Sequence, residues 1–292
     1  MPLTHERTFR VRHYECDAYG YVHYVHYLNY MQEAAFDASA AAGYGVPRYA
    51  AMGCYWLVRE TEVEVLRPLR YGDVVQVKTW VDDFRRVRSR RAYELRQVGS
   101  GALAARACTD WVFMDVAAGR PAPIPAEMLA AFFPEGLPEP GPPRPRFPAA
   151  PEPPPGVFRL RRQVEWRDVD TAGHVNNAAH LAYLEDCGVQ AAAARGWPAA
   201  RMQAEGFTVV ARQHRIEYLQ PALPGDEIEL ATWASDVDRS TAVRHYTARR
   251  VGDGALLVRA RTLWACVDVE TGQSLPIPDP FLTDLAPNIS KG

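Results

Sequence analysis

An internal repeat is the feature of this sequence that most constrains its fold. Asp17 and Asp170 lie 153 residues apart, and identical pairs continue at this spacing along most of the chain. One register without gaps predicts two copies of one fold, and two copies are too few for a solenoid. We therefore expect a pseudo-twofold pair, a dimer written on one chain. The matching pairs include Gly20 with Gly173, Val22 with Val175, Tyr30 with Tyr183, Gly43 with Gly196, Glu64 with Glu217, Trp80 with Trp233, Arg91 with Arg244, Trp111 with Trp264 and Ile124 with Ile277.

A proline-rich segment separates the two copies. It covers residues 134–156 and has the sequence PEGLPEPGPPRPRFPAAPEPPPG. Because proline fixes φ and lacks an N–H group, this segment is excluded from helices and from sheet interiors. We expect an extended, semi-rigid spacer. The sequence thus predicts a domain over residues 1–133, a linker over 134–156 and a second domain over 157–292.

Hydrophobic periodicity predicts the same order of elements in both copies. In the second copy, residues 159–168 alternate as a strand, a turn carries Gly173, and residues 177–195 show helical spacing. Asn176 is expected to cap the start of this helix and Gly196 its end. One long helix against one antiparallel sheet is an α+β architecture. Further strands are predicted over 207–219, 226–236, 242–251 and 255–267, and the first copy repeats the pattern with a helix over 24–42 and strands over 55–66, 73–83, 89–98 and 102–116.

Composition excludes several classes of protein. The formal net charge of -2, from 33 basic and 35 acidic side chains, gives no bias toward nucleic acid. The N-terminus lacks the apolar region of a signal peptide, and no stretch approaches the ~18 apolar residues of a membrane span. The five cysteines are scattered without a Cys-x-x-Cys pair, which is typical of reduced thiols rather than of disulfides or a zinc site. We expect a cytoplasmic protein without a membrane partner.

Each copy carries an Asp-x-x-Gly-x-Val segment just before its predicted helix. The run EWRDVDTAGHVNNAAHLAYLED resembles the signature of the 4-hydroxybenzoyl-CoA and acyl-ACP thioesterases of the hot-dog superfamily, and HYECDAYGYVHYVHYLNYMQE resembles it more loosely. The later runs EYLQPALPGDEIEL and EVLRPLRYGDVVQV resemble the next landmark of this family. The resemblance implies two hot-dog domains in tandem, each a long helix wrapped by an antiparallel sheet. It also implies that the two copies pair as an intramolecular pseudo-dimer, and it leaves further homo-oligomers open.

The resemblance also assigns the chemistry of thioester hydrolysis to particular residues. The catalytic carboxylate of the family maps to Asp17 and Asp170, as nucleophile or as general base. The oxyanion donor, a backbone N–H at the start of the helix, maps to Tyr24 and Asn177. Unpaired N–H groups and the positive end of the helix dipole fit this role. The implied reaction needs no metal and no organic cofactor.

The remaining candidate residues bind substrate in this scheme. Gly20 and Gly173 permit the sharp turn and close approach of substrate. The second copy adds the polar side chains of His174 and Asn176, whereas the first has His23 and bulky tyrosines, so we expect the second site to be the better one. Ala172 departs from the plant acyl-ACP thioesterases, which carry Asn there. Tyr30 and Tyr183 are expected to lie in the core or along the acyl tunnel, and Arg86, Arg88 and Arg90 belong to a basic run that could contact coenzyme A phosphates or an acidic carrier protein.

We therefore expect hydrolysis of acyl-CoA or acyl-ACP. Two alternatives stay open: a hydratase or dehydratase on the same fold, and a non-catalytic acyl-CoA-binding module. The first would place a catalytic histidine in a surrounding motif that is not found here. For each Asp, an ordinary role as a turn former is the competing interpretation.

Overall fold

The computed structural model describes residues 1–137, 139 and 143–290. The chain divides into two compact units, Met1–Arg146 and Phe147–Gly292. The division falls inside the proline-rich segment that was predicted to be a linker. We call these unit 1 and unit 2 and describe each by itself.

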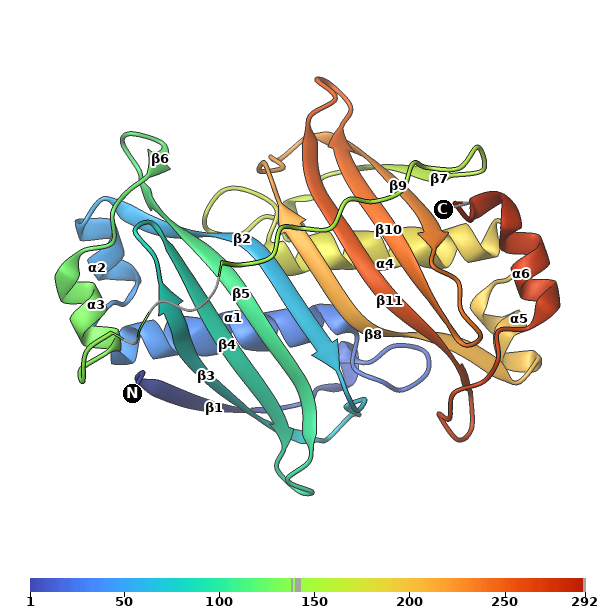
Figure 1. The fold of residues 1–292 in the computed structure, drawn as a ribbon, viewed down its shortest axis with the longest axis horizontal. Helices are drawn as coiled ribbons and strands as arrows, with labels where there is room; N and C mark the ends of the chain where they lie inside the picture. The colour runs from blue at the N-terminus through green and yellow to red at the C-terminus, as the bar shows by residue number, and fades with distance from the viewer. Residues whose placement is uncertain (138, 140–142, 291–292) are drawn as a thin grey trace. The chain divides into compact units, whose positions relative to one another are not determined.

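Unit 1 is an antiparallel sheet with one long helix. The sheet order is β1-β3-β4-β5-β2, and the short β6 pairs with β5. Helix α1 lies against β1 and β3 and runs behind the sheet (Figure 1). The elements are β1 (Thr4–Arg10), a 3-10 turn (His13–Glu15), α1 (Tyr24–Ala41), α2 (Val46–Ala51), β2 (Cys54–Val65), β3 (Val74–Phe84), β4 (Arg88–Gln97), β5 (Leu103–Asp115), β6 (Arg120–Pro121) and α3 (Ala126–Phe132).

Unit 2 repeats this arrangement. Its sheet order is β8-β11-β10-β9-β7, and α4 lies against β7 and β9. The elements are β7 (Phe158–Gln163), a 3-10 turn (Trp166–Asp168), α4 (Asn177–Ala193), α5 (Ala199–Ala204), β8 (Phe207–Tyr218), β9 (Glu227–Ser235), β10 (Thr241–Arg250), β11 (Leu256–Asp268), α6 (Asp279–Leu285) and a final 3-10 turn (Ala286–Asn288).

Side-chain burial explains why these segments form these elements. On β3, Val75, Val77 and Val81 are buried, and the side chains that alternate with them on the other face are more exposed. On α1, Tyr27, Tyr30 and Met31 are buried at the three- and four-residue steps of a helix. The sheet therefore buries one face against the helix, as the α+β prediction requires.

The predicted helices and the later strands are confirmed to within about two residues, but two expectations were wrong or incomplete. The first strand of unit 2 does not reach Asp168. It ends at Gln163, and a 3-10 turn covers Trp166–Asp168. The short helices α2, α3, α5 and α6 were not predicted, because six or seven residues carry too little periodicity to stand out.

The described part of the proline-rich segment contains no helix or strand, as its composition predicts. It is nevertheless anchored by side chains. In unit 1, Arg144 forms ion pairs with Asp83 and Asp110. In unit 2, the Phe147 ring lies under the guanidinium groups of Arg215 and Arg259, at 5.3 and 4.7 Å. The segment is therefore packed on the units at these points, a detail that the expectation of an extended, semi-rigid spacer did not include.

Candidate active site

The loop before α4 is a tight turn that brings Asp170 to the start of the helix. The Asp170 N–H donates to the His174 carbonyl at 3.1 Å, and the Gly173 N–H donates to the Asp170 carbonyl at 2.9 Å. Gly173 has a φ of +79°, a left-handed conformation that side chains with a Cβ rarely adopt. Val169 and Val175 close the loop as an isolated bridge. This glycine is thus required for the turn.

Both oxygens of the Asp170 carboxylate accept hydrogen bonds. Oδ1 accepts from the Ala172 N–H at 2.9 Å, and Oδ2 accepts from Asn176 Nδ2 at 3.0 Å. Asn176 is the N-cap of α4, since its Oδ1 accepts from the Ala178 N–H at 2.8 Å. The predicted cap is therefore confirmed, and the same side chain ties Asp170 to the helix. We call this contact the Asn176 tether.

Asn177 is the first residue of α4, so its N–H has no acceptor within the helix. The Asn177 carbonyl accepts from the Tyr218 hydroxyl at 3.1 Å, which fixes this first peptide against β8. The positive end of the helix dipole favours an anion at this point. The backbone can therefore stabilise a developing negative charge beside the Asp170 loop.

Two histidines accompany this loop. His174 places Nδ1 3.3 Å from the Val175 carbonyl, and its Nε2 is buried without a hydrogen-bond partner among the described residues. His180, one turn into α4, is buried between the rings of Tyr183 and Tyr218. Burial, and secondarily His174, lowers the pKa of His180 to about 3, so this ring is neutral. His174 thus has a ring nitrogen available, whereas His180 packs in the core.

The corresponding loop of unit 1 holds its aspartate differently. Asp17 Oδ1 accepts from the N–H groups of Tyr19 and Tyr21, at 2.9 and 3.0 Å. His23 stands at the position of Asn176, but its side chain is exposed and does not cap α1. Gly20 has a φ of +77°, so the turn itself is the same. Unit 1 therefore keeps the loop and the aspartate but lacks the tether.

Tyr24, the unit 1 counterpart of Asn177, begins α1, and its ring lies 6.4 Å from the Tyr27 ring. The loop is further fixed by Tyr21, whose hydroxyl accepts from Arg70 at 3.1 Å. Aromatic side chains thus surround the unit 1 loop where small and polar ones surround Asp170. The bulky tyrosines noted in the sequence thus lie around the unit 1 loop, as the sequence predicted.

Tyr30 and Tyr183 use their hydroxyls within the protein. Tyr30 donates to Glu15 at 2.5 Å, and Tyr183 donates to Asp168 at 2.6 Å. Burial and these hydrogen bonds raise the pKa of both phenols. Glu15 and Asp168 were missed as partners, although they occupy equivalent positions in the repeat. Both tyrosines are buried, as expected for core residues.

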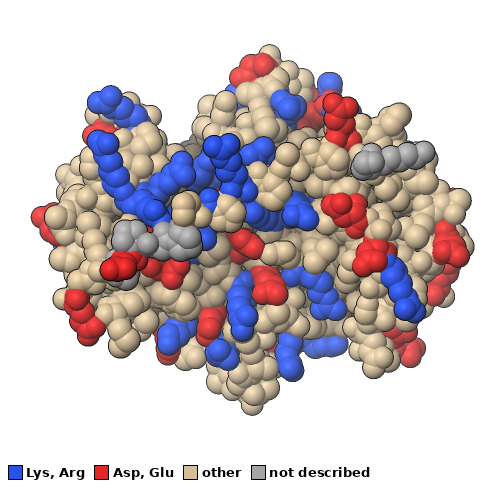
Figure 2. All heavy atoms as spheres, in the orientation of Figure 1, with Lys and Arg blue, Asp and Glu red and all other residues tan. Residues whose placement is uncertain are grey.

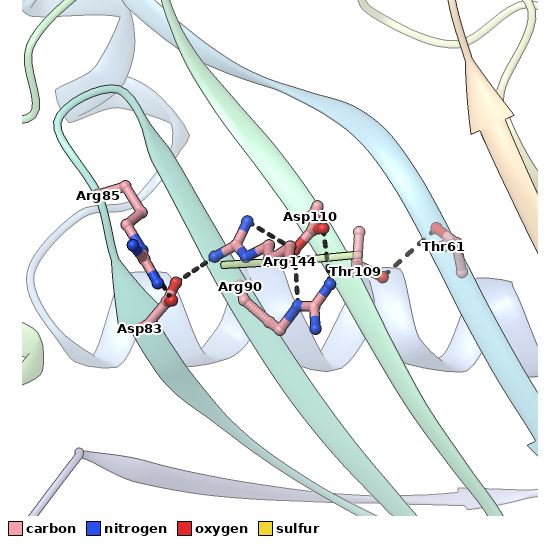
Figure 3. Close-up of polar contacts among 7 residues, drawn as sticks. All are labelled: Thr61, Asp83, Arg85, Arg90, Thr109, Asp110 and Arg144. Atoms are coloured by element: carbon pink, nitrogen blue, oxygen red, sulfur yellow. Dashed lines mark hydrogen bonds and ion pairs between the residues drawn. The ribbon is translucent and has the colours of Figure 1, made fainter. Parts of the chain in front are cut away.

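The basic run of unit 1 is divided by the structure into paired and unpaired arginines. Arg90 binds both oxygens of Asp110 at 2.8 Å, and Arg144 shares that carboxylate (Figure 3). The hydrogen bond to Asp110 is the main reason why the pKa of Arg90 is raised. Arg86 and Arg88 are exposed, and within the described ranges neither forms an ion pair. The three predicted substrate contacts are therefore not equivalent.

Metal-binding and membrane-spanning features are absent from the described residues. They contain no group of three or more His, Cys, Asp or Glu side chains that could hold a metal ion. The five cysteines are free. No helix within residues 1–137 and 143–290 has the length and hydropathy to cross a bilayer.

Solved structures with the same arrangement identify the fold. A Lactobacillus plantarum protein described as a candidate oleoyl thioesterase matches with a TM-score of 0.75 at 20% identity, over 94% of this chain and 98% of that one. The 12:0-ACP thioesterase from Umbellularia californica matches with a TM-score of 0.70 at 20% identity, over 90% and 94%. The chain is therefore a protein of two hot-dog units in tandem, which confirms the expected fold class.

Family models match each unit separately. Residues 2–132 match the acyl-ACP thioesterase N-terminal domain, and residues 164–285 match the thioesterase-like superfamily. The palmitoyl-acyl carrier protein thioesterase of Arabidopsis thaliana chloroplasts is 25% identical over 279 residues, 90% of this chain. The chain spans 64% of the length of that relative. Between them the two models cover both units, which confirms the resemblance to the hot-dog acyl thioesterases that the sequence motifs predicted.

Proposed function

We propose that this protein hydrolyses acyl thioesters to a carboxylic acid and a thiol, with unit 2 as its catalytic unit. The observation that carries the proposal is the Asn176 tether, which holds the Asp170 carboxylate at the N-terminus of α4. A carboxylate and a set of unpaired helix N–H groups are the two components that thioester hydrolysis requires. The family models that match the two units support the same reaction.

In this proposal the thioester carbonyl lies between Asp170 and the first turn of α4. Asp170 either attacks the carbonyl carbon or takes a proton from an attacking water. The Asn177 N–H donates to the oxyanion as the tetrahedral intermediate forms. The unpartnered Nε2 of His174 is available as an acceptor or donor for substrate or water. Collapse of the intermediate breaks the C–S bond, and the leaving thiolate takes up a proton. In the nucleophilic route a water molecule then hydrolyses the acyl-Asp170 anhydride, which releases the carboxylic acid and restores the carboxylate.

In this scheme the main role of unit 1 is to bind substrate rather than to catalyse its hydrolysis. Its Asp17 is held by backbone N–H groups alone, and His23 leaves the first turn of α1 without a side-chain cap. An aspartate that bonds its own loop in this way also fits the role of a turn former. We infer that Asp17 contributes little to turnover, in line with the poorer site expected from the sequence.

The exposed arginines of unit 1 favour an anionic carrier on the substrate. Arg86 lies beside residue 124, whose N–H donates to the Arg86 carbonyl at 3.0 Å, and Arg120 lies opposite Asp115 on the adjoining hairpin. Lys and Arg side chains gather over this part of unit 1 (Figure 2). Relatives act, by name, on acyl carrier protein thioesters, and an Escherichia coli relative, 28% identical over 113 residues, is described as an acyl-CoA thioester hydrolase. Acyl-ACP is the substrate we propose first, and acyl-CoA is the alternative.

Release of free thiol from a panel of acyl-ACP and acyl-CoA substrates tests this function. The wild-type protein should turn over at least one chain length, and Asp170→Asn should be slower by about 100-fold or more, as expected for loss of a base or nucleophile. An inactive wild type that still binds acyl-CoA would instead support the acyl-binding module. Hydration of an enoyl thioester without thiol release would support the hydratase alternative.

A further inference from the structure

Tyr183 lies two turns into α4, yet its hydroxyl is connected to Asp170 through three successive contacts. Tyr183 donates to Asp168 Oδ2 at 2.6 Å. The Asp168 carbonyl accepts from the Asn176 N–H at 2.8 Å. Asn176 Nδ2 in turn donates to Asp170 Oδ2 at 3.0 Å. Helix α4 thus holds Asp168 through Tyr183, and Asp168 holds the N-cap residue Asn176. Asn176 in turn holds the Asp170 carboxylate.

We propose that the Tyr183–Asp168 pair is a positioning device for Asp170. The inference rests on the proposed function, because it assigns these two side chains to the same site. Neither group contacts the reacting atoms. Their task is to fix the peptide at residue 168, so that Asn176 presents its amide to the carboxylate in one orientation.

The surroundings of the pair support a rigid contact. Tyr183 is 2% exposed, and the Asp168 side chain is 16% exposed. Arg162 from β7 lies 3.6 Å above the centre of the Tyr183 ring, and its Nη2 is 3.8 Å from Asp168 Oδ2. A short hydrogen bond from a neutral donor to a carboxylate is stronger than one between two neutral groups, and here the stacked guanidinium of Arg162 covers it. The anchor is therefore better ordered than an exposed loop alone would be.

Unit 1 contains the same anchor without its last link. Tyr30 donates to Glu15 Oε2 at 2.5 Å, and the Glu15 carbonyl accepts from the His23 N–H at 2.9 Å. There the sequence of contacts stops, because Asp17 is bonded by the Tyr19 and Tyr21 N–H groups instead. Tyr30→Phe is therefore a matched control that removes the same atom from the same place in the fold.

The experiment compares Tyr183→Phe with Tyr30→Phe in the full chain. Both variants should lose similar thermal stability. Tyr183→Phe alone should lower kcat, by about tenfold or more given the sensitivity of catalysis to small misplacements, with KM changed less than about twofold. Equal kcat values for the two variants would overturn the proposal, as would a Tyr183→Phe effect confined to KM.

A second variant keeps the proposal testable if Tyr183→Phe folds poorly. Asp168→Ala removes the acceptor of the same hydrogen bond, and by itself it should lower kcat relative to the wild type by about tenfold or more. The double variant should add little further loss, because both changes break one contact. Independent, additive losses would contradict a shared role.

Hydrogen exchange separates failure of this inference from failure of the proposed function. Tyr183→Phe should speed exchange of the backbone N–H of Asn176, whether or not the protein hydrolyses thioesters. Unchanged exchange in this variant would reject the anchor itself. If exchange is faster in Tyr183→Phe but the wild-type protein shows no turnover, the anchor stands and the hydrolytic assignment is rejected.

Discussion

The two tasks of Asn176 can be separated by substitution. Its Nδ2 holds Asp170, and its Oδ1 caps α4 through the Ala178 N–H. Serine is also a favoured N-cap residue, but its side chain is too short to supply the second contact. Asn176→Ser should therefore keep the cap and lose the tether, whereas Asn176→Ala should lose both.

The magnitudes follow from the two contacts. A hydrogen bond to a charged group contributes about 1.5–3 kcal/mol, and Asn176 is only half-buried, so the lower end applies to the tether. Loss of an N-cap costs about 1 kcal/mol. We expect Asn176→Ser to lose about 1.5 kcal/mol in the free energy of unfolding and Asn176→Ala about 1 kcal/mol more. Both should lose about 10- to 100-fold in kcat, because both leave Asp170 without its amide.

Urea denaturation and steady-state turnover of the three proteins check this prediction. The important comparison is between stability and kcat: the two variants should differ in the first and agree in the second. A wild-type kcat in Asn176→Ser, with a loss only in Asn176→Ala, would show that the cap matters and the tether does not. That result would refute the role assigned to Asn176.

Further predictions concern pH, charge and the first unit. The pKa of His180 is lowered from its ordinary 6.5 to about 3, so the unfolded chain takes up the proton before the folded protein does. The free energy of unfolding should therefore fall by up to about 1.4 kcal/mol per pH unit between pH 6.5 and pH 3. His180→Phe should flatten this slope in denaturation experiments at pH 7 and 4.5. Charge reversal at Arg86 and Arg88 should raise KM for acyl-ACP, most at low salt, while the equally exposed Arg249→Glu should not; equal effects would reject the basic surface. His23→Asn should cap α1 and stabilise the protein by about 0.5–1 kcal/mol, and an unchanged midpoint of thermal unfolding would contradict the uncapped helix.

The fold could be predicted from the sequence because its determinants are local or repeated. The 153-residue register and the hydrophobic periods located the two long helices and most strands, and Asn176 was placed correctly as a cap from its residue type alone. The exception is the end of β7, where an alternating pattern continues past Gln163 into a 3-10 turn. Alternation cannot show that the backbone at residue 164 turns to donate to the Asp226 carbonyl.

The candidate site was predicted less completely, because its partners are distant in sequence. Asp17 and Asp170 were proposed from their motif, and the structure places each in a turn before the long helix of its unit. The partner of Tyr183, Asp168, was missed, and so was the neutralisation of Arg90 by Asp110. Both contacts depend on which side chains a turn or a strand register brings together, and no local pattern of residues records that.

The measurement that tests the central claim most directly is turnover of one acyl thioester by Asp170→Asn and Asp17→Asn, each with unchanged thermal stability. Both substitutions preserve size and remove the carboxylate charge. If unit 2 is the catalytic unit, Asp170→Asn should lose about 100-fold or more in kcat, and Asp17→Asn should stay within about threefold of the wild type. Equal losses, or a larger loss in Asp17→Asn, would contradict the assignment of catalysis to the tethered aspartate.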